Sequence, residues 1–448
     1  MISNQPLPKA RLRRTALAGL VVSLASAVSS FAAEPASTIN SGDTAWLMTS
    51  TALVLFMMIP GLALFYAGLV KAKNTLSIYM QCFVLTCALS LLWLVCGYSL
   101  SFSGEGKFLG GLGRMFMSGV TPDTVRSDYK NIPEILWFAY QAMFFLITPG
   151  LFIGAFAERM KFKAMLIFSL VWSLVVYVPC CYGVWHSEGA KVAGDFLGLT
   201  GVKDLAGGIV VHITAGVAAL VLCIVVGPRR GFSHSSFIPH NLPLTIIGAA
   251  MLWVGWFGFN GGSQVAANGA AAMTITVTHL SACTAALVWM TIEWLALGKP
   301  SALGIATGSI AGLAAITPAS GLVGPIGALC IGATSATLCW LACSKLKRKF
   351  GYDDSLDVFG VHGVGGFVGT LLLAVFGSKS FAGGFGDFEI GKQFVTQLLA
   401  AVYTVILSGV ASYAILKVIA LFMPLRVTED EERMGLDLAE HGETAYGE

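Results

Sequence analysis

The sequence predicts an all-α integral membrane protein with eleven transmembrane helices. Of its 448 residues, 56% are hydrophobic and only 11% are charged, whereas soluble domains carry roughly a quarter charged residues. A helix needs about 20 predominantly apolar residues to span a bilayer, and eleven such runs can be drawn along the chain. The net charge of +3 is too weak to indicate a nucleic-acid partner.

Residues 1–32 are predicted to form a cleavable signal peptide. A cluster of basic residues precedes an apolar stretch that ends in small residues. Among these, Ser30 and Ala32 fit a small-x-small cleavage site before Ala33. The alternative is an uncleaved anchor helix. Cleavage would place the mature N-terminus in the periplasm, on the outer side of a bacterial inner membrane.

The membrane domain is predicted to cover residues 43–423, with a cytoplasmic tail at 424–448. We expect an inverted repeat of five plus five helices, 43–228 and 240–378, before a last helix at about 391–423. The predicted spans lie near 44–70, 78–100, 132–156, 164–185, 205–227, 241–260, 269–297, 302–317, 323–344, 357–377 and 391–423. Lys and Arg occur in every connection that this orientation places inside, as the positive-inside rule requires.

No metal, cofactor or enzymatic centre is predicted. The ten cysteines fall almost entirely within apolar runs and show no CxxC spacing, so they indicate small buried side chains rather than metal ligands or disulfides. No pairing of a nucleophile with a base is recognisable. The 52 glycines are concentrated in the spans, which predicts closely packed helices.

Two histidines at membrane depth are the strongest functional signal. Asp204 precedes His212 by eight residues, and Asp354 precedes His362 by the same number. Because the fifth and tenth helices would run antiparallel, the two histidines should approach the bilayer centre from opposite sides. The alternative is a pair of core histidines bonded to backbone carbonyls. Both acids are expected to cap their helix starts, although Asp204 could instead contact a ligand.

Several segments in a fixed order resemble the ammonium transporter family (Amt/MEP/Rh), most closely its bacterial Amt branch. They are AYQAMFFLITPGLFIGAFAERMKF (139–162), GVWHSEG (183–189), DLAGGIVVHITAG (204–216), PHNLPLTIIGAAMLWVGWFGFNGGS (239–263), ITPASG (316–321), DDSLDVFGVHGVGG (353–366) and GLDLAEHGETAYGE (435–448). The resemblance covers roughly residues 43–448. It implies a pore through each subunit of a homotrimer, with ammonium, ammonia and methylammonium as ligands and no enzymatic activity.

The resemblance also implies roles for individual residues. An outer recruitment site would comprise Phe144, Trp185 and Ser263, with Tyr140 above them. Aromatic faces attract a small cation, and a hydroxyl accepts an N–H bond. The other implied positions are the stacked gate rings Phe144 and Phe259, the twin pore histidines His212 and His362, and Thr317 near the outer vestibule. The alternative for the aromatic residues is ordinary membrane packing.

Two departures from the family pattern bear on the outer side. Tyr140 stands where many members have Phe, and its hydroxyl could make the vestibule more polar. The stretch from Trp185 to Asp204 is also long. At the other end, the acidic tail could be disordered by composition, but its resemblance to the family's tail implies partial order and a regulatory role. A PII signalling protein is an implied cytoplasmic partner.

The expected mechanism is recruitment of ammonium, its deprotonation, and passage of neutral ammonia along the two histidines with a coupled proton. Three alternatives remain open. The protein could be an ammonium sensor with little flux, a Rh-like channel for neutral gas, or a membrane redox protein that holds haem between His212 and His362.

Overall fold

The computed structural model describes residues 38–104, 106–186, 201–232 and 237–447. The chain divides into two units, Met1–Ile39 and Asn40–Glu448, and nearly all of the described residues belong to the second unit. The predicted signal peptide at 1–32 lies outside the described residues.

Within the described residues, the regular elements of the second unit are helices, joined by loops. Its α-helices are α2 (Ser41–Phe56), α3 (Ala63–Leu69), α4 (Thr75–Leu92), α5 (Tyr98–Phe102), α6 (Glu134–Phe156), α7 (Phe162–Trp172), α8 (Val178–Trp185), α10 (Thr214–Val226), α11 (Leu242–Gly262), α12 (Gly269–Leu297), α13 (Ala302–Ile316), α14 (Pro325–Leu341), α15 (Lys347–Phe350), α16 (Val364–Phe376), α17 (Ile390–Ala420), α18 (Glu429–Met434) and α19 (Leu436–His441).

Short π-helical turns join several of these helices into longer spans. The turns are η1 (Met57–Leu62), η3 (Trp93–Gly97), η5 (Ser173–Tyr177), η6 (Gly208–Ile213), η7 (Ala342–Leu346) and η8 (Phe359–Gly363). Such turns occur frequently at functional sites. The turns η6 and η8 carry the two predicted histidines.

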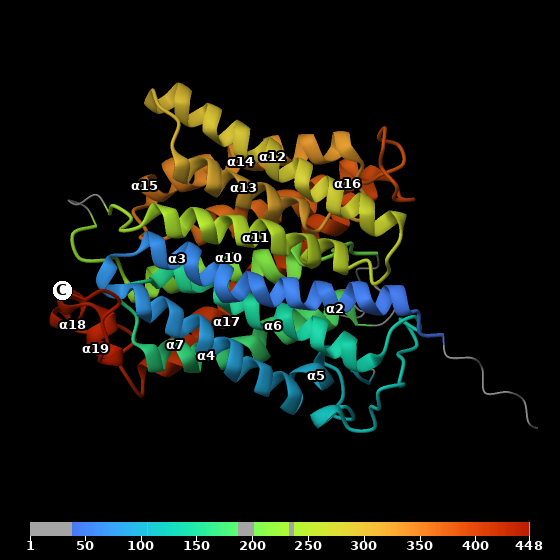
Figure 1. Ribbon diagram of the computed structural model, residues 1–448, viewed down its shortest axis with the longest axis horizontal. Coiled ribbons are helices and arrows are strands. Elements are labelled where there is room, and N and C mark those ends of the chain that lie inside the picture. The colour runs from blue at the N-terminus through green and yellow to red at the C-terminus, as the bar shows by residue number, and fades with distance from the viewer. Residues whose placement is uncertain (1–37, 105, 187–200, 233–236, 448) are drawn as a thin grey trace, which may run out of the picture. The chain divides into compact units, whose positions relative to one another are not determined.

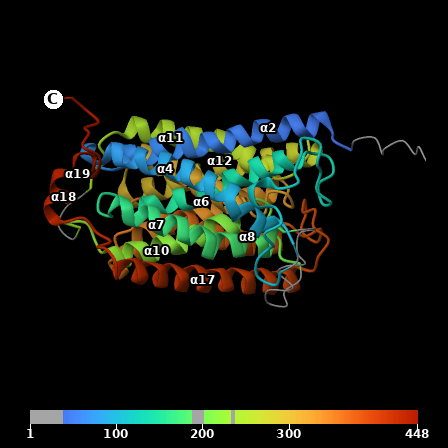
Figure 2. The same ribbon diagram turned by 90° about the horizontal axis from the view of Figure 1, so that it is seen from below.

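Within the described residues, ten helical segments are long and apolar enough to cross a membrane, and α13 is a shorter eleventh apolar helix. The predicted all-α membrane fold is therefore confirmed, and each predicted span corresponds to one of these segments. The long helices lie side by side, with α18, α19 and the C-terminus together at one end (Figures 1 and 2). We call this the tail end of the helices, and the opposite end the far end.

Small residues let the helices approach closely. A methyl group added at Gly308 or Gly312 of α13 would lie 2.6 Å from the Cβ of Trp289 or Ala285 of α12, respectively. Both contacts are too close for a Cβ, so each glycine is needed for the observed helix separation. In lipid, where burial of apolar surface does not drive helices together, such close packing holds them.

A buried ion network lies at the tail end of the helices and links the two halves of the predicted repeat. Arg229 bonds Asp353 at 2.8 Å and Glu158 at 3.3 Å. Burial raises the pKa of the Asp353 carboxyl, but the hydrogen bonds and charge of Arg229 outweigh it and hold that pKa below its usual value. The network therefore joins the turn after α10 to the loop that precedes η8.

The tail is ordered against this end of the helices. Thr428 and Glu431 form a reciprocal cap at the start of α18, and Arg230 pairs with Glu429 at 2.9 Å. Further along, Asp437 of α19 accepts the backbone N–H of Ser77, in the first turn of α4, at 2.7 Å. A tail residue thus caps a membrane-spanning helix.

Candidate functional site

A pocket of about 310 Å³ opens at the far end of the helices. Of the residues predicted for the recruitment site, Trp185 and Ser263 line it, and so does the predicted acid Asp204. Phe144 lies beneath the opening, and its ring is 5.7 Å from the Trp185 ring in an edge contact. Gln141 also lines this far pocket, although the sequence did not single it out.

Trp185 is held in one orientation. Its indole N–H donates to the backbone carbonyl of Asp204 at 2.8 Å, while its ring meets the edge of Phe144. Because the hydrogen bond and the ring contact act on the same side chain, the indole is fixed at the mouth of the pocket. A fixed aromatic face is what a small cation needs.

The carboxylate of Asp204 is fully occupied by the backbone. It accepts the N–H groups of Gly207 and Gly208 on one oxygen, and those of Ile209 and Val210 on the other, at 2.7 to 3.1 Å. These are the otherwise unpaired donors at the start of η6. The geometry therefore supports a helix-capping role for Asp204 rather than direct contact with a ligand.

Tyr140 is buried next to the recruitment residues rather than in the opening. Its hydroxyl lies 2.9 Å from the carbonyl oxygens of both Gly258 and Phe259, and 3.1 Å from the Ser263 hydroxyl. The last turns of α11 thus satisfy the phenol, and its oxygen is directed away from solvent. Ser263 itself donates to the Phe259 carbonyl at 2.9 Å, which leaves its oxygen as an acceptor.

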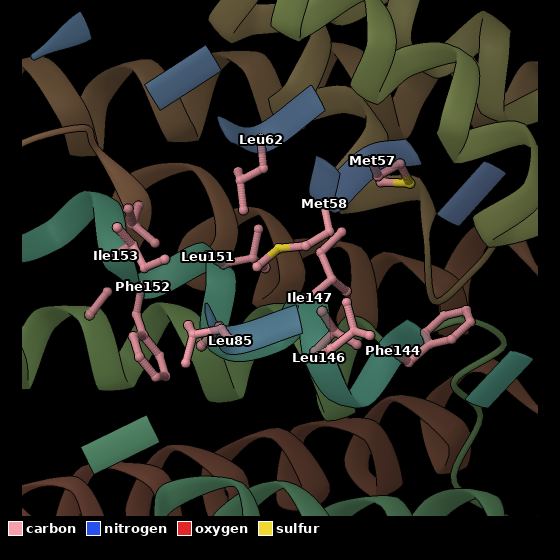
Figure 3. Close-up of a cluster of buried hydrophobic side chains, with 14 of the residues drawn as sticks. Met57, Met58, Leu62, Leu85, Phe144, Leu146, Ile147, Leu151, Phe152 and Ile153 are labelled. Atoms are coloured by element: carbon pink, nitrogen blue, oxygen red, sulfur yellow. The ribbon is translucent and has the colours of Figure 1, made fainter. Parts of the chain in front are cut away.

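Two phenyl rings separate the far pocket from the interior. Phe144 and Phe259 have centroids 4.4 Å apart and an interplanar angle of 34°, and both are buried. Figure 3 shows Phe144 at one end of a row of α6 side chains that includes Ile147 and Leu151. A hydrated ion cannot pass these rings without their displacement.

Beneath the rings lies a narrow passage of about 10 Å³, which is roughly the space that one water molecule requires. It is lined by Met57, Leu62, Phe65, Ile147, Leu151, Val211, His212, Leu252, Trp256, Phe259, Ile310 and His362. The walls are apolar except for the two imidazoles and the indole. We call this space the histidine passage.

The two histidines meet in this passage. Their Nδ1 atoms are 3.2 Å apart, and their rings lie 5.2 Å apart at 23°. In a neutral pair, one Nδ1 donates and the other accepts. The Nε2 atom of His212 is buried and has no hydrogen-bond partner within the described part of the chain. A buried polar atom of this kind favours a small hydrogen-bonding molecule beside it.

Each histidine is followed four residues later by a glycine that faces the other half of the repeat. A Cβ at Gly216 would lie 2.2 Å from the backbone nitrogen of Gly363, next to His362. A Cβ at Gly366 would lie 2.7 Å from the Cβ of His212. α10 therefore packs closely on η8, and α16 on η6, as equivalent helices of an inverted repeat would.

A second pocket, of about 300 Å³, opens at the tail end and includes His362 in its lining. Lys347 and Asp357 also line this tail-side pocket and pair with each other. Nearby, Asp354 accepts the backbone N–H of Phe359 at 2.7 Å and so caps η8. Burial and the neighbouring Asp357 raise the pKa of Asp354 to about 6.

Thr317 and Trp256 form a pair beside the passage. The indole N–H of Trp256 donates to the Thr317 hydroxyl at 2.9 Å, and that hydroxyl donates to the Leu313 carbonyl. Thr317 is buried and is not among the residues that line the far pocket. Trp256 was not predicted from the sequence, although the spacing of Leu252, Trp256 and Phe259 places all three on one helix face.

This arrangement defines a polytopic α-helical membrane protein with a narrow passage between two pockets. The chain matches the model of the Ammonium Transporter Family over residues 45–446. An ammonium transporter of Bacillus subtilis is 42% identical over 409 residues, 90% of this chain and 98% of that protein. The chain belongs to the ammonium transporter family, which confirms the resemblance seen in the sequence.

Solved structures of this family have the same fold. Mep2 of Candida albicans matches with a TM-score of 0.81 and 33% sequence identity, covering 93% of this chain and 92% of that one. A protein described as a sensor Amt protein matches with a TM-score of 0.80 and 26% identity, covering 89% and 98% of the two chains. Ammonium transport is therefore the function that family membership supports.

Proposed function

We propose that the protein recruits ammonium in the far pocket, removes its proton, and conducts ammonia through the histidine passage to the tail side. The order of the features supports this proposal. Phe259 forms both the lower gate ring and a wall of the passage, and His362 belongs to both the passage and the tail-side pocket. The two pockets are thereby linked through a single apolar constriction.

Charge decides which species can use this route. An ammonium ion gains roughly 0.5 to 2 kcal/mol over an aromatic face, and the Ser263 oxygen can accept one of its N–H bonds. In the passage the same ion would lose its hydration shell, and no carboxylate lines the passage to compensate its charge. Moving the ion through this space would therefore cost much free energy. Neutral ammonia is small enough for the space and can hydrogen-bond to the imidazoles. Deprotonation of ammonium before it enters the passage therefore avoids the free-energy cost of desolvating the ion.

The histidine pair offers a path for the released proton. Two imidazoles whose Nδ1 atoms are 3.2 Å apart can pass a proton along their hydrogen bond. We propose that this proton accompanies ammonia, so that transport carries net charge. The spacing between the rings and the volume of about 10 Å³ leave no room for haem, which argues against the redox alternative.

The remaining expectations rest on the family resemblance, except that the orientation rests on the predicted signal peptide and on the positions of the basic residues. They are assembly as a homotrimer, insertion in the bacterial inner membrane with a periplasmic mature N-terminus, methylammonium as a second ligand, and a PII signalling protein at the tail side. In this orientation the far pocket faces the periplasm and the tail faces the cytoplasm. Basic residues around the tail, such as Arg230 and Lys161, are consistent with that assignment.

An ammonium pulse across proteoliposomes tests the function. The wild-type protein is expected to give a current absent from empty liposomes. Trp185→Leu should weaken the apparent affinity by roughly two- to thirtyfold, because it removes the aromatic face offered to the cation. The control is Trp294→Leu, a change at an exposed tryptophan on α12, which should keep wild-type affinity. Equal affinity in all three proteins would rule out the recruitment site.

A sensor remains the second candidate function. The observation that favours it is the match to a sensor Amt protein, together with a tail that is joined to the turn after α10 and to α4. A sensor would bind ammonium in the far pocket without sustained current. Ammonium-dependent protection of the tail from hydrogen exchange, in a protein that gives no current, would select this function.

We propose that the tail regulates the passage through its docking on α4. Asp437→Ala removes a helix cap, a loss typically worth about 1 kcal/mol, so amide exchange in residues 428–441 should rise roughly fivefold. Transport should fall in this variant, and further on deletion after Leu425. Asp430→Asn, at an exposed acid of α18, is the matched control. Unchanged transport after the deletion would contradict a regulatory tail.

A further inference from the structure

The far pocket contains one charged side chain that its other residues do not neutralise. Lys203 and Asp204 are the charged residues of its lining, whereas Gln141, Ser263 and Gln264 supply neutral polar groups. In the part of the chain that the structure describes, the Lys203 ammonium group has neither a carboxylate nor a hydrogen-bond acceptor as its partner. A pocket proposed to recruit a cation therefore carries a positive charge in its wall.

The neighbouring Asp204 does not cancel this charge. Its two carboxylate oxygens each accept two backbone N–H groups at the start of η6, and the residue is buried. The negative charge of Asp204 is thus compensated by the partial positive charge at that helix start. The Lys203 side chain is only half-buried, so its charge acts on an ion that enters the pocket.

The backbone of Lys203 is held in place by α17. Its N–H donates to Gln397 Oε1 at 2.9 Å, and Gln397 Nε2 donates to the Lys203 carbonyl oxygen at 2.7 Å. The next carbonyl oxygen, that of Asp204, accepts the indole N–H of Trp185 at 2.8 Å. The base of the lysine side chain therefore has a fixed place relative to the indole.

We propose that Lys203 destabilises ammonium bound beside Trp185 and thereby favours loss of its proton before ammonia enters the histidine passage. A nearby like charge disfavours the charged form of an ionisable group, whereas neutral ammonia is not repelled. The N–H bond breaks, its electron pair stays on nitrogen, and the proton passes to water as hydronium. This inference rests on the proposed function, because it assigns a role within the same pocket.

Removal of the charge should change affinity and maximal rate together. A charge that raises the free energy of the bound ion weakens its binding and eases its deprotonation. Lys203→Gln should therefore lower both the half-saturating ammonium concentration and the maximal current of proteoliposomes. We expect each to fall roughly two- to sixfold at low salt, the Coulomb factor for two charges about 4 to 8 Å apart in water. Lys203→Arg keeps the charge and should retain both wild-type values.

Salt separates this electrostatic role from a structural one. Sodium chloride at about 1 M on both sides of the membrane shortens the screening length to about 3 Å. The wild-type half-saturating concentration should then approach that of Lys203→Gln, whereas a difference caused by altered packing would persist. The matched control is Lys392→Gln, at an exposed lysine in the first turn of α17 that does not line the pocket. It should keep wild-type affinity and current at both salt concentrations.

Several results would overturn the inference. They are an unchanged half-saturating concentration in Lys203→Gln at low salt, tighter binding with undiminished maximal current, a difference that persists at high salt, and an equal change in Lys392→Gln. Thermal unfolding checks that each variant folds. Trp185→Leu, measured beside them, separates this inference from the proposed function. If Trp185→Leu weakens affinity while Lys203→Gln changes nothing, the role of Lys203 fails and the recruitment site stands. If Trp185→Leu keeps wild-type affinity, the recruitment site fails, and the Lys203→Gln result still decides whether this charge acts on the ion.

Discussion

Replacement of both His212 and His362 by alanine is expected to abolish the ammonium-evoked current. The two imidazoles supply the hydrogen-bonding groups at the centre of the histidine passage, and their Nδ1 atoms touch at 3.2 Å. Each hydrogen bond left unmade in a buried site costs about 1 to 3 kcal/mol, so loss of both partners should lower the current roughly thirtyfold or more. Proteoliposome currents measure this directly.

A histidine outside the passage provides the control for this experiment. His279 lies exposed on α12 beside Trp253, and His279→Ala should retain the wild-type current. The single variant His362→Ala separates the two roles of the pair. Uptake of labelled methylammonium that persists without current would assign proton transfer to the pair, whereas undiminished current in the double variant would remove the histidines from the mechanism.

Alanine at Gly216 is expected to block transport although it lies outside the passage lining. Its Cβ would come within 2.2 Å of the Gly363 nitrogen and 2.3 Å of the Gly363 Cα, and backbone cannot yield as a flexible side chain does. Overpacking of this kind costs about 1 to 3 kcal/mol. α10 and η8 must separate, which shifts His362 away from His212, so we expect at least a roughly tenfold loss of current and a lower melting temperature.

The inverted repeat supplies a second test and α17 supplies a control. Gly366→Ala, which meets the Cβ of His212 at 2.7 Å, should reproduce the defect. Gly409→Ala on α17 meets only Val217 at an ordinary 3.6 Å, and should be neutral in both stability and current. Wild-type current in Gly216→Ala would mean that the direct backbone crossing does not position the histidines.

Much of this architecture could be predicted from the sequence because lipid imposes strict rules on a chain. Every span needs a long apolar run, and a polar group within it needs a cavity or a partner. The run lengths therefore located the spans, and the equal Asp-to-His spacings located two related turns. The meeting of His212 with His362, which the repeat predicted, appears in the structure at 3.2 Å.

The finer geometry of the site was not accessible in the same way. The place of Tyr140 depends on the carbonyl groups at the end of α11, which are more than a hundred residues away in the chain. Trp256 joins the passage because Thr317 of another segment receives its indole N–H. Such partners are determined by how the helices pack, and no local sequence pattern around either residue predicts them.

The sequence alone was enough to establish the membrane class, the spans and the paired histidines, since run length and spacing are properties of a single chain. Its motifs carried the family resemblance. Only the tertiary structure showed the passage of about 10 Å³, the glycine crossings and the cap that Asp437 places on α4. These features arise between segments that are distant in sequence, because close packing and hydrogen-bond satisfaction are decided by neighbours in space.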